Sequence, residues 1–293
     1  MPRFRDQGRV WVSIVFVVAL SSMADSTASG ASGAEAQARI AADIAAGRPV
    51  VVHLVVALCD NQNQGIVPVP RSLGNGQDPR SNLYWGARFG VRGYFGRERG
   101  WKNVDVDKPI DKRIRERLVY STEIQRGNRA AAVYVVADAW DGAEMRSAIQ
   151  SFFAIASGRA PEDVSIRRGS QPLTIQAGGV AHLAAFVGHN GLMDFSLPPP
   201  DRSMRRQTPG SSIVLACASK PYFLDRLHGI GSHPLLLTTG LMAPEAYTLD
   251  AVIRSWIGDG SVTAAREAAA TAYDRYQKCG LRAARNLFWS ESP

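Results

Sequence analysis

The chain has 293 residues, of which 45% are hydrophobic and 20% charged, a composition typical of a globular protein with a sizeable core. Its net charge of +8 comes from scattered basic residues with two short clusters, at 112–117 and 202–206. A nucleic-acid-binding surface needs a continuous basic face with interleaved aromatic residues, so this pattern argues against nucleic acid as a partner. The three cysteines are too few for a disulfide framework.

Residues 1–24 have the pattern of a secretory signal peptide. Three arginines precede the apolar run 10–20, and Ser22-Met23-Ala24 provides a small-x-small cleavage site. An apolar run of 11 residues is too short to cross a bilayer comfortably. We therefore expect a periplasmic or secreted protein that has no membrane association after cleavage and keeps a net charge of +6.

The segments after this signal alternate between helical and extended patterns. Small polar residues at 25–37 predict a flexible tether, and 38–47 predicts a short helix closed by glycine. The continuous apolar run 49–59 is typical of a strand buried on both faces. The loop 60–82 is long for a compact domain, which indicates a functional or disordered segment, and 83–95 predicts a helix weakened by three glycines.

The middle of the chain predicts a hairpin, a helix and two buried strands. Residues 116–125 and 130–140 flank the turn "RGNR" and predict paired strands. The segment 141–158 has apolar residues at helical spacing, and the apolar runs 181–187 and 212–217 predict strands.

The C-terminal part predicts a helix at 221–231, a buried strand at 233–240 and a helix at 261–280. Strands that alternate with helices predict an α/β fold, with a largely parallel sheet flanked by helices and a helical C-terminal segment. We expect a single domain over residues 38–293.

Polar residues follow several of the predicted strands, and in a parallel sheet the carboxyl ends of the strands form the usual binding edge. The residues delivered there are Cys59, Asp60 and Asn61 after the first strand, Asp138 and Asp141 in the hairpin, His189 and Asn190, Cys217 and Ser219, and Thr238 and Thr239. A buried strand does not need such residues, so their convergence predicts a functional site.

His189 and Cys217 form the pair with the clearest chemistry. A thiol attacks as the thiolate, and a neighbouring imidazole supplies that form by taking the proton. Ends of adjacent parallel strands lie about 5 Å apart, which would bring the two side chains within reach of one another. The backbone amides of Gly191 and Cys217 could then stabilise an oxyanion between them.

The sequences "VGHNG" (187–191) and "VLACAS" (214–219) resemble the two strand-end signatures of caspase-like cysteine peptidases, a group that includes caspases, metacaspases and gingipain-type enzymes. The resemblance implies a caspase-like three-layer sandwich, His189 as general base and acid, and Cys217 as nucleophile. It also implies an endopeptidase that acts on a peptide or protein substrate and needs no cofactor. Asn190 departs from the family, which has glycine directly after the histidine, and this puts the role of Gly191 in doubt.

The same resemblance places the histidine strand between the first strand and the cysteine strand. Cys59 and Cys217 would then lie about 9–10 Å apart, too far for an unstrained disulfide. Cys59 is accordingly interpreted as structural or, with Asp60, as a second polar wall beside His189. Cys279 carries no motif, so we expect it at the surface or in packing.

Asp60, Asn61 and Asp138 are candidates for lining a substrate cleft, although Asp60 and Asn61 taken singly favour a turn or cap. An aspartate after the first strand also occurs in phosphohydrolases, but Gln62 stands where their second aspartate would be. The histidines have no metal-ligand spacing, so no metal site is predicted. The alternative function is a non-catalytic exported binding protein of the same fold; the oligomeric state stays open.

Overall fold

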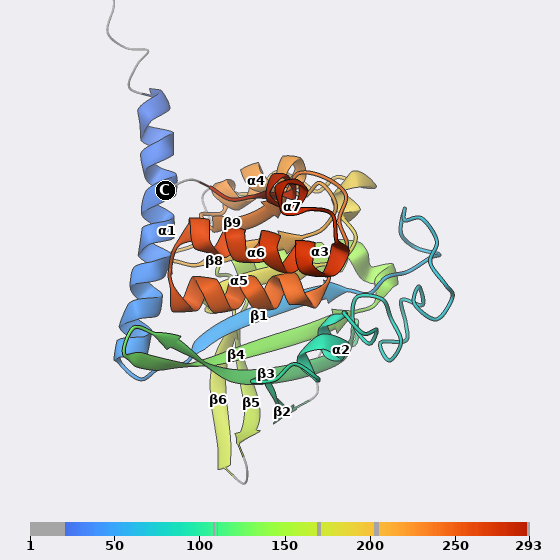
Figure 1. Ribbon diagram of the computed structural model, residues 1–293, viewed down its shortest axis with the longest axis horizontal. Coiled ribbons are helices and arrows are strands. Elements are labelled where there is room, and N and C mark those ends of the chain that lie inside the picture. The colour runs from blue at the N-terminus through green and yellow to red at the C-terminus, as the bar shows by residue number, and fades with distance from the viewer. Residues whose placement is uncertain (1–20, 108, 110, 169–170, 202–204, 292–293) are drawn as a thin grey trace, which may run out of the picture.

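The fold is built on a mixed sheet of ten strands with helices on both faces (Figure 1). The structure, a computed structural model, describes residues 21–107, 109, 111–168, 171–201 and 205–291. The strand order is β10-β9-β8-β7-β1-β4-β3-β2-β5-β6. Residues 1–20, which hold most of the expected signal peptide, lie outside the described residues.

Five neighbouring strands at the centre of the sheet are parallel. They are β4 (Arg129–Trp140), β1 (Val50–Ala57), β7 (Leu183–Val187), β8 (Ser211–Leu215) and β9 (His233–Thr238). Every residue of β1, β7, β8 and β9 is buried, as the continuous apolar runs predict. β1 pairs with β4 on one side and with β7 on the other. The order of the parallel strands in the sheet therefore reverses direction at β1.

The rest of the sheet is antiparallel. The strands are β3 (Ile114–Arg126), β2 (Lys102–Val106), β5 (Pro161–Arg168) and β6 (Gln171–Gly178) on one side, and β10 (Phe288–Trp289) at the other edge. The predicted hairpin of β3 and β4 is confirmed. The α/β class is also confirmed, but the sheet is mixed rather than largely parallel. The additional strands β2, β5 and β6 are rich in polar and charged residues, so they lack the apolar runs that mark buried strands.

Helices cover the two faces of the sheet as separate layers (Figure 1). On one face α1 (Ser21–Ala45), α5 (Ala246–Gly258) and α6 (Val262–Gln277) pack on the larger hydrophobic core. On the other face α3 (Met145–Ala156) and α4 (Lys220–Gly229) pack on a second core. The short helices are α2 (Val91–Phe95), α7 (Leu281–Leu287) and the 3-10 turns η1 (Gly142–Glu144) and η2 (Gly191–Met193).

Two predicted segments differ from the structure for local reasons. The segment 25–37, predicted as a tether, lies within α1, because its alanine residues favour helix and Ala36 packs into the core. The predicted helix 83–95 is reduced to α2, and residues 83–90 form turns in keeping with their glycines. Within the described residues, no helix combines the length and hydropathy needed to cross a bilayer.

Candidate active site

His189 and Cys217 occupy equivalent positions beyond two adjacent parallel strands. Val187 of β7 pairs with Leu215 of β8, and each candidate residue follows its paired residue by two positions. The amide of Gly188 donates to the carbonyl of Leu215 over 3.2 Å, so the pairing continues past the ends of both strands. The sheet therefore places the backbones of His189 and Cys217 at matching positions beyond neighbouring strand ends.

The backbone around both residues is held in left-handed conformations. Gly188 has φ +151°, and a Cβ there would lie 2.9 Å from the carbonyl oxygen of Ala57 in β1. Ala218, directly after Cys217, has φ +45°, which is costly for a residue with a side chain. Its amide donates to Gly240 over 2.8 Å, which holds the chain in this sharp turn.

Asn190 ties the two strand ends together. Its amide nitrogen Nδ2 donates to the carbonyl oxygen of Cys217 over 2.9 Å, and its Oδ1 accepts from the amide of Leu192 over 3.2 Å. The side chain is fully buried. The asparagine that departs from the family pattern therefore fixes the position of the cysteine segment relative to the histidine.

Asp194 orients the imidazole of His189. The distance between His189 Nε2 and Asp194 Oδ2 is 2.6 Å, with the imidazole buried and the carboxylate half-exposed. Because Nε2 donates to this carboxylate, Nδ1 is the ring nitrogen left to exchange a proton with a thiol or a substrate. The orientation of the imidazole is therefore set by Asp194.

The loop after β1 supports the same aspartate. The amide of Gly65 lies 3.4 Å from Asp194 Oδ2 and donates to it. Within this loop, Gln64 donates to the carbonyls of Leu58 and Gly142 over 2.7 and 3.0 Å. The long loop is thus ordered by side-chain hydrogen bonds, and one end of it contacts the candidate site.

Cys217 is partly exposed and has polar backbone groups beside its sulfur. The amide of Met242 donates to Sγ over 3.4 Å, and Sγ lies 3.6 Å from the carbonyl oxygen of the same residue. The sulfur therefore lies against the backbone of Met242. Behind the thiol, Ser219 and Thr238 bond to one another over 3.0 Å and join the ends of β8 and β9.

Comparison with known proteins gives no relative. No family model, curated protein or solved structure matches this chain.

Cys59, the second thiol near this edge, is in a different environment. It is fully buried, and burial raises the pKa of its thiol to about 11. The side chain of Asn82 fixes the backbone of Cys59. It accepts a hydrogen bond from the Cys59 amide over 3.0 Å and donates one to the Cys59 carbonyl over 2.8 Å. A buried thiol with this pKa is protonated at neutral pH, so Cys59 is a structural residue and a poor nucleophile.

Gly191 does not have the geometry expected of an oxyanion donor. Its amide donates to the carbonyl of His189 over 3.1 Å, because the chain turns into η2 at this point. A Cβ on Gly191 would lie 2.5 Å from Met145 Cγ, so the glycine is required for close packing under the loop. The expected oxyanion role of Gly191 is corrected to a packing role.

Asp60 and Asn61 organise the loop rather than line a cleft with the thiol. Asp60 accepts hydrogen bonds from Gln62, Asn63 and Gln77 at 2.8 to 3.2 Å. Burial opposes its ionisation, but these hydrogen bonds outweigh that effect and lower the pKa of the carboxyl group. Asn61 exchanges two hydrogen bonds with the backbone of Val69, at 2.8 and 3.0 Å.

Asp138 lies apart from the thiol. It is two residues before the end of β4, and its carboxylate bonds to His53 of β1 over 3.1 Å and to Arg117 of β3 over 2.6 and 2.7 Å. Trp140, two positions on, belongs to the core beneath α3, which places Asp138 on that face because side chains alternate along a strand. Asp138 therefore belongs to the charged cluster of His53 and Arg117 rather than to the strand ends that carry His189 and Cys217.

The spacing between His189 and Asp194 is a sequence signal for their contact. Asp194 follows His189 by five residues, and a tight turn of about that length can return a carboxylate to a preceding imidazole.

Among the described residues, no group of three or more His, Cys, Asp or Glu side chains could hold a metal ion.

Proposed function

We propose that this protein is an exported thiol hydrolase in which Cys217 is the nucleophile, His189 the proton carrier and Asp194 the residue that orients His189. The observation that carries the proposal is the equal register of His189 and Cys217 beyond adjacent parallel strands, with His189 Nε2 held by Asp194. A histidine with a purely structural role, whose hydrogen bonds are all made within the protein, does not require a partly exposed cysteine at the matching position of the next strand.

The residues can perform acyl transfer in two steps. In the first, the Cys217 thiol gives its proton to His189 Nδ1, and the thiolate adds to a substrate carbonyl carbon. The tetrahedral intermediate collapses to a thioester as His189 protonates the leaving amine. In the second, His189 removes a proton from water, whose oxygen displaces the thiol and releases the acid. The backbone amide of Cys217 is the proposed donor to the oxyanion.

A peptide is the proposed substrate, and this part rests on the caspase-like resemblance. The order β1-β7-β8, with the histidine strand between the first strand and the cysteine strand, agrees with what that resemblance implies and supports the proposal. The finer assignment to a caspase-like sandwich remains part of this proposal.

Hydrolysis of a peptide pool tests the proposal. The protein is incubated with a mixture of synthetic peptides of varied sequence, and new termini are counted by mass spectrometry. We expect cleavage by the wild type, a loss of roughly 10³-fold or more in Cys217→Ala, and full activity in Cys279→Ala, where an exposed thiol is removed instead. Cleavage that persists in Cys217→Ala would exclude Cys217 as the nucleophile.

A non-catalytic binding protein is the second candidate. It is favoured by one observation, that a large cavity of the described structure is lined by residues other than His189 and Cys217. Absence of cleavage in the peptide pool together with ligand binding in that cavity would favour this second function.

A further inference from the structure

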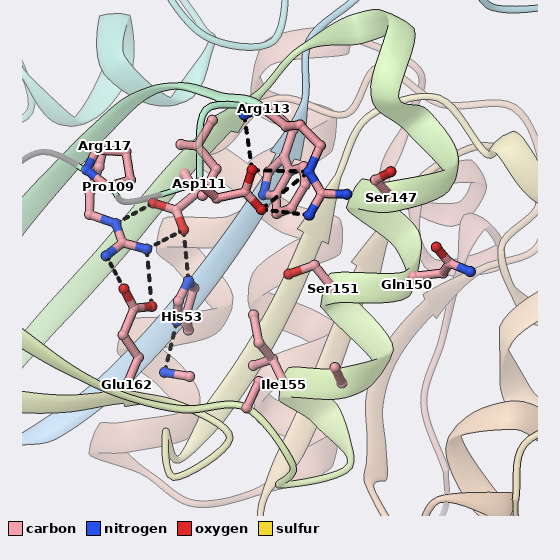
Figure 2. Close-up of a pocket in the computed structure, with 16 residues that line it drawn as sticks. His53, Pro109, Asp111, Arg113, Arg117, Ser147, Gln150, Ser151, Ile155 and Glu162 are labelled. Carbon is pink, nitrogen blue, oxygen red and sulfur yellow. Dashed lines mark hydrogen bonds and ion pairs between the residues drawn. The ribbon is translucent and has the colours of Figure 1, made fainter.

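A cavity with a volume of about 650 Å³ lies between α3 and the strands β3, β4 and β5 (Figure 2). Cavities of this size hold small organic molecules in many proteins. Neither His189 nor Cys217 lines it, so it is separate from the proposed active site.

One wall of the cavity is a buried network of charged side chains. Arg117 pairs with Asp138 through two hydrogen bonds, at 2.6 and 2.7 Å, and also pairs with Glu162 of β5. Burial opposes the ionisation of Asp138, but the hydrogen bonds from Arg117 and His53 outweigh it and lower the pKa of the carboxyl group. Both Arg117 and Asp138 are therefore charged within the wall.

His53 adds no charge to this wall. Its Nδ1 accepts a hydrogen bond from the amide of Gly178 over 2.8 Å, so the ring proton is on Nε2, which donates to Asp138 over 3.1 Å. A second ring proton would break the bond to Gly178. The imidazole is neutral in this geometry.

The opposite wall is the face of α3 that carries Ser151 and Ile155, which face the charged network across the cavity (Figure 2). Arg113 and Asp111 form a third side, joined to one another by hydrogen bonds of 2.7 to 3.2 Å. Trp140 also lines the cavity. Its indole N–H is buried and has no hydrogen-bond acceptor among the described residues.

The charges around this cavity do not cancel. The described residues that line it include three carboxylates and two guanidinium groups, a net charge of −1. Two of the carboxylates, Glu162 and Asp111, are about one-third exposed and lie where a ligand could reach them. A partly enclosed site with unbalanced negative charge favours a cation, because few water molecules are available to screen it.

We propose that this cavity binds a small organic cation that carries a primary ammonium group beside an amide or hydroxyl oxygen. The ammonium group would donate to the carboxylates of Glu162 and Asp111, and the oxygen would accept from the hydroxyl of Ser151. The N-terminus of a short peptide and an amino sugar both offer this chemistry. The proposal does not depend on the hydrolase function.

Binding is measured by NMR titration of the isotope-labelled protein with two matched pairs of probes. Alanyl-alaninamide is compared with its N-acetyl form, and glucosamine with N-acetylglucosamine, because acetylation removes the charge in each case. We expect at least one cationic probe to bind roughly tenfold more tightly than its acetylated partner. The pair that shows the larger difference identifies whether the ligand is peptide-like or sugar-like.

Three variants locate the binding. Glu162→Gln should remove the preference for the cation, and Ser151→Phe should weaken binding of both members of a pair by filling the cavity. Asp163→Asn is the matched control, because Asp163 is the next residue of β5 and lines a different cavity. It should leave binding unchanged. Circular dichroism establishes that each variant is folded.

Some results would overturn the proposal. One is equal binding of cationic and acetylated probes, or no binding of either cation. Another is binding that is unaffected by Ser151→Phe in the folded variant, which would place the ligand elsewhere. Cys217→Ala should bind the probes as the wild type does, so failure of the hydrolase proposal leaves this result unchanged.

Discussion

Asp194 returns to His189 because η2 reverses the chain between them. The carboxylate is half-exposed and accepts from both the imidazole and the amide of Gly65. Its negative charge would stabilise the imidazolium that forms when Cys217 gives up its proton. In the proposed mechanism the aspartate is therefore a positioning residue that acts on the substrate through His189.

Replacement of this carboxylate should therefore slow the chemical step. For Asp194→Asn we expect kcat to fall about 10- to 100-fold with a smaller change in KM, since the side chain keeps its size but loses its charge. Steady-state kinetics on a cleaved peptide measures this. Asp225→Asn, at an exposed position of α4, is the control and should keep its kcat. An unchanged kcat in Asp194→Asn would remove Asp194 from the mechanism.

At the residue level, sequence patterns predicted the pair His189 and Cys217 because both follow continuous apolar runs. They did not predict the surroundings of Asp138, whose partners Arg117 and His53 are 21 and 85 residues away in the chain. Asp138 lies within β4, two residues before its end, so its side chain points to the α3 face and not to the edge of the sheet. A sequence pattern that ends the strand two residues earlier would place Asp138 at the edge. Strand ends are the least certain feature of a sequence pattern.

Among the elements, the junction of α1, β1 and β7 depends on a buried histidine. His182 Nδ1 accepts from the amide of Val51 over 3.1 Å, and Nε2 lies 2.8 Å from Asp43 Oδ2 of α1. Burial lowers the pKa of His182 to about 4, and the guanidinium of Arg39 acts in the same direction, while Asp43 opposes them. The histidine is therefore neutral in the folded protein at neutral pH.

This junction predicts a loss of stability in mild acid. The ordinary pKa of histidine is about 6.5, so below that pH the unfolded chain takes up a proton that folded His182 does not. The free energy of unfolding should fall on the order of 3 kcal/mol through this group as the pH drops from about 6.5 to about 4. Urea unfolding of wild type and His182→Gln at pH 7 and pH 4.5 measures the difference.

In His182→Gln the free energy of unfolding should depend less steeply on pH than in the wild type between pH 7 and pH 4.5. His228→Gln is the control, because His228 is partly exposed and Glu291 raises its pKa, the opposite direction. That variant should not flatten the curve. Parallel curves for wild type and His182→Gln would contradict the assignment.

For the whole molecule, the five parallel strands and the hairpin were predictable because apolar, β-branched runs mark them. The antiparallel extension β2-β5-β6 was not, since its exposed positions carry charged residues that resemble loop sequence. The helix α1 was only partly predicted, because small residues in the segment 25–37 suit both a linker and a helix. Contact with the sheet decides between them, and that contact lies outside any local pattern.

The three cysteines of the molecule differ in burial, and their relative reactivity tests the proposed function most directly. At pH 7 each thiol is alkylated with iodoacetamide, and rates are followed by peptide mass spectrometry. We expect Cys217 to react at least about tenfold faster than exposed Cys279, and Cys59 to react slowest because it is buried and its pKa is about 11. In His189→Ala, the Cys217 rate should fall to that of Cys279. A Cys217 rate no higher than that of Cys279, or one that does not change in His189→Ala, would contradict the proposed dyad.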